Sequence, residues 1–204
     1  KNLTIEEINK KNFSQISLLL NKGQYSVAEK KVKELINKHP KNLIFQNFLA
    51  IIYASQKRFE DSKIILKKII DKSPEFIDAH INLGNIYIDL NQLEKSAKCY
   101  KKVIEINPNN ILASQNLAII YDKQNKFKDA SEIYSKLVLK NPDNLELLNS
   151  YSGNQIKLGK FDNAKKILND ILRIDPNYIN AIINLGVVYK DEKKFNKAIQ
   201  YYLL

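Results

Sequence analysis

The stretch INLGNIYIDLNQLEKSAKCYKKVIEINP, residues 81–108, decides the fold of this chain. Its pattern of large apolar, small and polar residues returns 34 residues later as QNLAIIYDKQNKFKDASEIYSKLVLKNP, residues 115–142. Self-similarity at a fixed period of this length indicates an array of short helical units. Each such unit is too small to bury its own apolar face and must stack on its neighbours.

The prolines give the period most clearly. Successive prolines are 34 residues apart, at Pro40, Pro74, Pro108, Pro142 and Pro176. This spacing divides the chain into residues 1–42, 43–76, 77–110, 111–144, 145–178 and a truncated unit, 179–204. Pairs such as Ser73-Pro74 and Asn107-Pro108 combine a capping side chain with a residue favoured at the first helical position, so we expect a new helix to begin at each proline.

Within each unit, the positions of small residues predict two closely crossing helices. Small side chains recur at positions 8 and 20 of the unit, as in Gly84 and Ser96, and larger ones would push the helices apart. Position 15 holds the residue that closes the first helix in the left-handed conformation, and Gly or Asn suits it in most units. Lys57 and Lys193 depart from this rule, so we expect their turns to be formed differently.

This combination of positions resembles the tetratricopeptide repeat family, which residues 43–178 match in full and residues 179–204 match in part. The resemblance implies an all-α fold, a right-handed superhelical solenoid of stacked antiparallel helical hairpins. Residues 1–42 match less well and are expected to form an atypical capping or first unit. The chain lacks an initial Met and stops within a unit, so we expect a fragment of a longer protein.

In this family the first helices of the hairpins line a concave groove, and the resemblance places a peptide-binding site there. An amide can pair with both the N–H and the C=O of a passing peptide backbone. The asparagines at position 6 resemble the ladder in the repeat superhelix of O-linked N-acetylglucosamine transferases, but the same amides also suit a groove without a backbone-reading role. The candidate groove residues are Asn82, Asn85, Asn116, Asn184, Asp78, Glu146, Phe48 and Ile119.

Charge limits the class of partner. The formal net charge is +11, but the basic residues gather in the second helices, whereas the first helices carry more acidic than basic residues. We therefore expect a neutral to basic protein or peptide in the groove and no nucleic acid there. The lysine and arginine positions of the family's clamp for acidic C-terminal peptides are not matched in this chain.

Residues suited to catalysis are sparse. The chain has one cysteine, Cys99, and two histidines, His39 and His80, all of which we interpret as structural. The five glycines form no phosphate-binding loop, so we expect no enzymatic activity, metal or cofactor. No apolar run is long enough for a membrane span, and we expect a cytoplasmic protein.

Three functional hypotheses follow from the sequence. The first is a non-catalytic scaffold that binds a protein or peptide in the groove. The second is a substrate-recruiting arm of a larger enzyme, such as a glycosyltransferase. The third is an array that self-associates through its last helix, where Tyr201 and Tyr202 would lie exposed.

Overall fold

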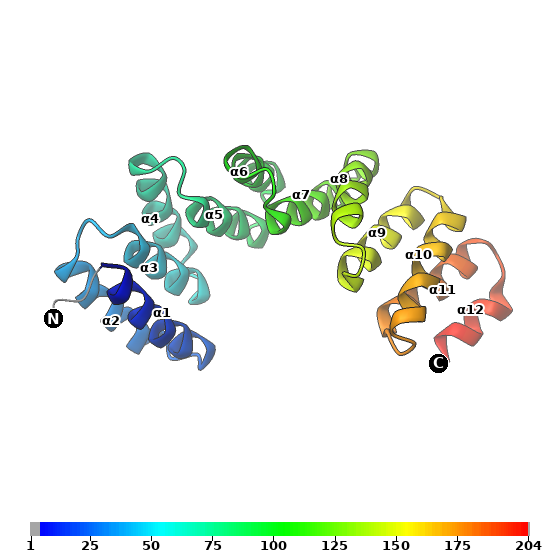
Figure 1. The fold of residues 1–204 in the computed structure, drawn as a ribbon, viewed down its shortest axis with the longest axis horizontal. Helices are drawn as coiled ribbons and strands as arrows, with labels where there is room; N and C mark the ends of the chain where they lie inside the picture. The colour runs from blue at the N-terminus through cyan, green and yellow to red at the C-terminus, as the bar shows by residue number, and fades with distance from the viewer. Residues whose placement is uncertain (1–4, 204) are drawn as a thin grey trace. The chain divides into compact units, whose positions relative to one another are not determined.

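The structure is a computed structural model that describes the backbone of residues 5–203 and the side chains of residues 12–203. The described residues form helices that follow one another as antiparallel hairpins (Figure 1). The helices are α1 (Ile5–Asn21), α2 (Tyr25–Lys38), α3 (Leu43–Ser55), α4 (Phe59–Lys72), α5 (Ile77–Asp89), α6 (Leu93–Ile106), α7 (Ile111–Lys123), α8 (Phe127–Lys140), α9 (Leu145–Lys157), α10 (Phe161–Ile174), α11 (Ile179–Asp191) and α12 (Phe195–Tyr202). The chain divides into two compact parts, each of which holds several of the 34-residue repeats. They are the first unit, Lys1–Pro108, and the second unit, Asn109–Leu204. The predicted all-α repeat fold is confirmed.

The two helices of each hairpin cross at the small residues, as the sequence predicts. In the first unit, the Ser62 hydroxyl of α4 donates a hydrogen bond to the Ala50 carbonyl of α3 (2.7 Å). Ser96 of α6 donates in the same way to the Gly84 carbonyl of α5 (2.8 Å). A Cβ added at Gly84 would lie 3.0 Å from the ring of Tyr100. The crossing therefore leaves little room for a larger side chain.

The turns within the hairpins share one geometry, including the two that the sequence singled out. Lys57 (φ 62°) and Lys193 (φ 61°) adopt the left-handed conformation. The N–H of Arg58 donates to the Tyr53 carbonyl (2.8 Å), and the N–H of Lys57 donates to the Ala54 carbonyl (2.9 Å). The same conformation occurs at Gly23, Asn91, Asn125 and Gly159. The expectation of differently formed turns at the lysines is wrong, because these hydrogen bonds close the helix whatever residue stands there.

The prolines do not begin the helices, and that prediction is also wrong. Pro74 lies in a turn in which the Phe76 N–H donates to the Ser73 carbonyl (3.0 Å), and α5 begins only at Ile77. Proline's fixed φ suits the second residue of such a turn. Side-chain caps come instead from the residue directly before the helix, where an Asn oxygen accepts a backbone N–H at the start of α3, α7 and α9.

Each unit has its own apolar core. In the first unit, α1 covers α2 and α3, and its fully buried Ile16 packs with Val32 and Phe45. A second cluster of this unit joins α3 to α6, with Leu66 and Ile69 fully buried. In the second unit, α9, α10 and α11 share a core that includes Leu168 and Leu185. Burial of these side chains by neighbouring hairpins explains why the hairpins stack within each unit.

Candidate functional site

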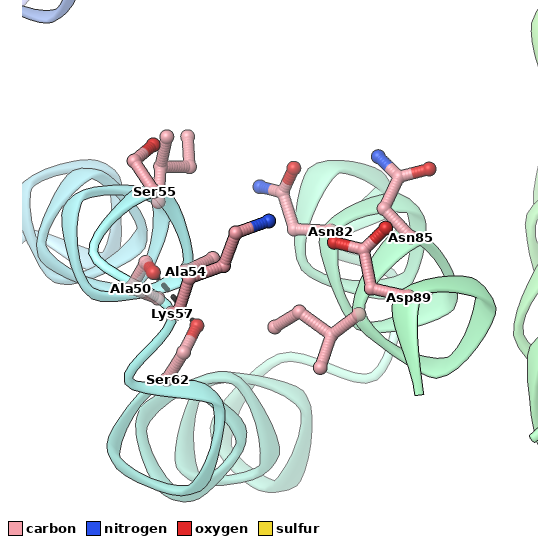
Figure 2. A pocket seen from close by; sticks show the side chains of 10 residues that line it. Ala50, Ala54, Ser55, Lys57, Ser62, Asn82, Asn85 and Asp89 are labelled. Atoms are coloured by element: carbon pink, nitrogen blue, oxygen red, sulfur yellow. Dashed lines mark hydrogen bonds between the residues drawn. The ribbon is translucent and has the colours of Figure 1, made fainter. Parts of the chain in front are cut away.

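A pocket of about 250 Å³ opens in the first unit between α3 and α5. Small side chains, Ala50 and Ala54, leave space on the α3 side, and the carbon atoms of Ile51 and Ile86 add apolar surface. Polar groups complete the lining (Figure 2): Ser55, Lys57, Ser62, Asn82, Asn85 and Asp89. Two of the predicted groove residues, Asn82 and Asn85, are thus brought together. Both come from α5, one turn apart.

Asn82 also links two successive hairpins. Its Nδ2 donates a hydrogen bond to Oδ1 of Asn47 on α3 (2.9 Å), and Asn47 is buried. In the second unit, Nδ2 of Asn184 on α11 donates to Oδ1 of Asn149 on α9 with the same spacing (2.9 Å). Asn82 and Asn184 therefore each fasten two neighbouring first helices together, and this explains in part why an amide recurs at position 6. The pair leaves the Asn82 carbonyl oxygen and one N–H for other contacts.

The remaining polar groups of the pocket carry charge of both signs. The amine of Lys57 extends toward Asn82 and Asp89 (Figure 2). Within the part of the chain that the structure describes, neither Lys57 nor Asp89 has an ion-pair partner within 4.0 Å. Asn85 is exposed and accepts a hydrogen bond from the Tyr100 hydroxyl through its Oδ1. The pocket thus offers an ammonium, a carboxylate and two amides to a ligand.

The other predicted groove residues have varied surroundings. Asp78 and Glu146 are exposed in the first turns of α5 and α9, where a carboxylate also favours the helix dipole. Asn116 and Ile119 are half-buried on α7 of the second unit. Phe48 is only 6% exposed and packs edge-on against Phe13 in the core of the first unit. Phe48 has too little accessible surface to bind a ligand and is not part of the pocket lining.

A buried polar network in the second unit was missed by the sequence reasoning. Asn154 of α9 is fully buried, and its Nδ2 donates to Oδ1 of Asp122 (2.7 Å) and to the Phe127 carbonyl (3.0 Å). Gln155, only 1% exposed, donates through Nε2 to the Ser131 hydroxyl (2.9 Å). The sequence holds a signal of this network. Most other 34-residue repeats have an aliphatic residue at the position of Asn154 and a tyrosine at the position of Gln155. These polar groups join α9 to the hairpin of α7 and α8.

Several ionisable groups have shifted pKa values with structural causes. Burial raises the pKa of the Cys99 thiol to about 11, so Cys99 stays protonated at neutral pH. Burial, followed by the charge of Asp122, raises the pKa of the Tyr134 hydroxyl. Glu192 accepts a hydrogen bond from Lys165 of α10 (2.8 Å), which lowers the pKa of the Glu192 carboxyl. The Glu192 shift arises between neighbouring hairpins, whereas the Tyr134 shift involves a residue of its own hairpin.

The described residues carry neither a metal site nor a membrane span. No three His, Cys, Asp or Glu side chains among them are grouped so that they could hold a metal ion. Within the same residues, every helix is too short or too polar to cross a membrane. His80 is 7% exposed and its Nε2 lies 2.8 Å from the Pro74 carbonyl, which confirms its structural interpretation.

Comparison with known proteins supports the repeat fold. A profile of the coatomer epsilon subunit family matches residues 4–204, whereas no curated protein matches the sequence. Similar solved structures include a tetratricopeptide repeat protein from Parabacteroides merdae, with 18% identity and a TM-score of 0.79 over 96% of this chain and 76% of that one. YrrB, described as a TPR protein with an unusual peptide-binding site, has 18% identity and a TM-score of 0.70 over 83% and 88%. MamA from Desulfovibrio magneticus has 14% identity and a TM-score of 0.72 over 79% and 91%.

At these identities the similar structures establish the fold alone, and they confirm the tetratricopeptide repeat predicted from the sequence. The comparisons agree with the prediction of a non-catalytic protein. The family profile extends over almost the whole chain. This chain is therefore a member of the coatomer epsilon subunit family, built as a tetratricopeptide repeat array.

Proposed function

We propose that this protein is a scaffold that binds an extended segment of a partner protein along its first helices. The fold and the family are those of proteins that assemble with other proteins. The pocket between α3 and α5 is the observation on which the proposal depends, because it combines space, two amides and two charged groups without an ion-pair partner in the described residues. YrrB, whose fold is similar, is described as having a peptide-binding site.

The geometry suits recognition of a peptide backbone together with one side chain. Asn82 lines the pocket (Figure 2), and its side-chain carbonyl oxygen can accept a backbone N–H of the peptide. Asp89 favours a basic or neutral side chain of the peptide, and Asp78 adds an exposed carboxylate on the same helix. A net hydrogen bond contributes only about 0.5–1.5 kcal/mol, so we expect affinity to depend on the side chain that fills the pocket.

Mutation of the two amides tests this proposal, with a matched control. An array of partner-derived and random peptides would first supply ligands, and their affinity would then be measured by fluorescence polarisation. Asn82→Ala breaks the link to Asn47 and also removes the pocket amide, whereas Asn47→Ala breaks only the link, because Asn47 is buried. We expect Asn85→Ala and Asn82→Ala to weaken binding several-fold and Asn47→Ala to leave it nearly unchanged.

The control gives the experiment its discriminating power. If Asn47→Ala weakens binding as much as Asn82→Ala, the amide acts by holding α3 against α5 and does not contact the peptide. If neither Asn82→Ala nor Asn85→Ala changes the affinity for any ligand, the pocket is not the binding site and the proposal is wrong.

A further inference from the structure

A second pocket lies in the first unit among the helices α4, α5 and α6, and the groove proposal makes no use of it. Its volume is about 330 Å³. Unlike the first pocket, it is lined mainly by second helices. The lining residues are Lys67, Ile70, Asp71, His80, Leu83, Lys98, Cys99 and Lys102. This pocket shares no residue with the pocket between α3 and α5.

The floor of the second pocket is apolar. Leu83 and Cys99 are 6% and 8% exposed, and Ile70 is half-buried beside them. Because the Cys99 thiol remains protonated at neutral pH, it adds no charge to this floor. The His80 ring is held by the Pro74 carbonyl through Nε2. An aliphatic or aromatic side chain would lose its hydration here without burying a charged group.

The rim of the second pocket is basic. Lys67 of α4 and Lys98 of α6 are exposed, and within the described residues neither has an ion-pair partner within 4.0 Å. Lys102 is exposed and forms an ion pair with Glu105 (3.1 Å). Asp71 is the acidic residue of the lining, so cationic groups outnumber it three to one. An apolar floor inside a cationic rim complements a ligand with an apolar centre and anionic flanks.

We propose that an acidic segment of a partner protein docks on this lysine-rimmed pocket, placing one apolar side chain on the floor between flanking carboxylates. The pocket lining contains no Arg, Phe, Tyr or Trp, on which nucleic acid bases stack, and its one aromatic ring, that of His80, is buried and held by the Pro74 carbonyl. A hollow with a buried apolar floor also suits one inserted side chain better than the flat surface of a membrane. The protein would then bind two segments of different charge on different surfaces of one unit.

The direct test uses short labelled peptides with one central Leu flanked on both sides by Asp and Glu. Binding is measured by fluorescence polarisation, and the central Leu is replaced by Ser in a second peptide. The variant Lys67→Glu/Lys98→Glu reverses two charges of the rim. Its control, Lys68→Glu/Lys95→Glu, makes the same change in net charge on the same two helices but outside the pocket lining. We expect the rim variant to lose at least about tenfold in affinity and the control to lose little.

Cys99 supplies a readout specific to the floor. Since it is the only cysteine of the chain, its rate of alkylation at raised pH reports whether the pocket is occupied. We expect the Leu peptide to slow alkylation of the folded protein and the Ser peptide to slow it much less. The two peptides differ only at the inserted side chain, so this comparison isolates the apolar contact.

Three results would overturn the inference. The first is the absence of saturable binding. The second is a lack of specificity: equal affinity for the Leu and Ser peptides, or an equal loss of affinity in the rim and control variants, would indicate general attraction between charges. The third is binding to phosphatidylserine vesicles that depends on Lys67 and Lys98 while the peptides do not bind, which would assign the patch to a membrane. None of these outcomes bears on the groove, because the variants leave Asn82 and Asn85 unchanged.

Discussion

Replacing Asn154 with Ile should destabilise this protein, although isoleucine or valine occupies the equivalent position of the neighbouring hairpins. Ile52, Ile86, Ile120 and Val188 stand there and are buried. By sequence pattern alone the substitution would restore a regular repeat. In the structure it would remove the donor that Asp122 and the Phe127 carbonyl share.

The magnitude follows from the groups left without that donor. A hydrogen bond to a charged acceptor contributes about 1.5–3 kcal/mol, and one to a carbonyl contributes about 1 kcal/mol. Burying the isoleucine side chain returns about 1.5 kcal/mol. We therefore expect Asn154→Ile to lower the free energy of unfolding by about 1–2.5 kcal/mol. The Lys157 amine, 3.6 Å from the Asp122 carboxylate, limits the loss, since it still faces that charge.

The assay is urea denaturation followed by far-UV circular dichroism in a double-mutant cycle with Asp122→Asn. In the native protein Asp122→Asn removes a favourable charge, but in the Asn154→Ile background it removes a poorly paired one. We expect the double mutant to be more stable than the sum of the single effects predicts, by about 1 kcal/mol. Wild-type stability of Asn154→Ile, or strict additivity of the two changes, would refute this reasoning.

Three further predictions test other parts of the structure. Gly153→Ala should raise the free energy of unfolding by about 0.5–1 kcal/mol in urea titrations, because alanine is favoured over glycine inside a helix such as α9. The added Cβ has room, since no neighbouring side chain or helix lies within 4 Å of it. Glu192→Gln should lower the free energy of unfolding by roughly 0.5–1 kcal/mol at neutral pH, because it removes the carboxylate charge that pairs with the Lys165 amine. Since the pKa of Glu192 is lowered in the folded state, that deficit should vanish as the pH falls through this lowered pKa in thermal scans. Phe195→Glu/Ile199→Glu, on the exposed face of α12, should abolish any rise of mass with concentration in sedimentation; an unchanged rise would exclude self-association through this helix.

The hairpins could be predicted from the sequence because their signals are local and repeated. Gly84 and Ser96 mark a helix crossing by their size alone, and Asn91 marks a left-handed turn. The hydrogen bonds of side chains between hairpins could not be predicted in this way. Asn82 contacts Asn47, which is 35 residues away, and this partner is visible only when the stacking of α3 and α5 is known.

The two wrong predictions about the fold, on the lysine turns and on the proline helix starts, have a common physical origin. Both rest on residue preferences, and a preference of about 1 kcal/mol is easily overridden by packing in a folded protein. Pro74 is well suited to begin a helix, but the turn from Ser73 to Phe76 uses the same fixed φ. Similarly, the hydrogen bonds that close the helix before the turn hold Lys57 in a conformation that glycine would adopt more readily.

Lys57 links stability to recognition in this protein. A residue other than glycine in the left-handed conformation costs about 1–2 kcal/mol, and glycine would recover part of that cost. Yet glycine would also delete the ammonium group that reaches into the pocket beside Asn82 and Asp89. The lysine at this strained turn therefore places a positive charge where a glycine turn would have no side chain. A Lys57→Gly protein would be more stable than the native protein and, if the groove binds as proposed, would discriminate less between peptides of different charge.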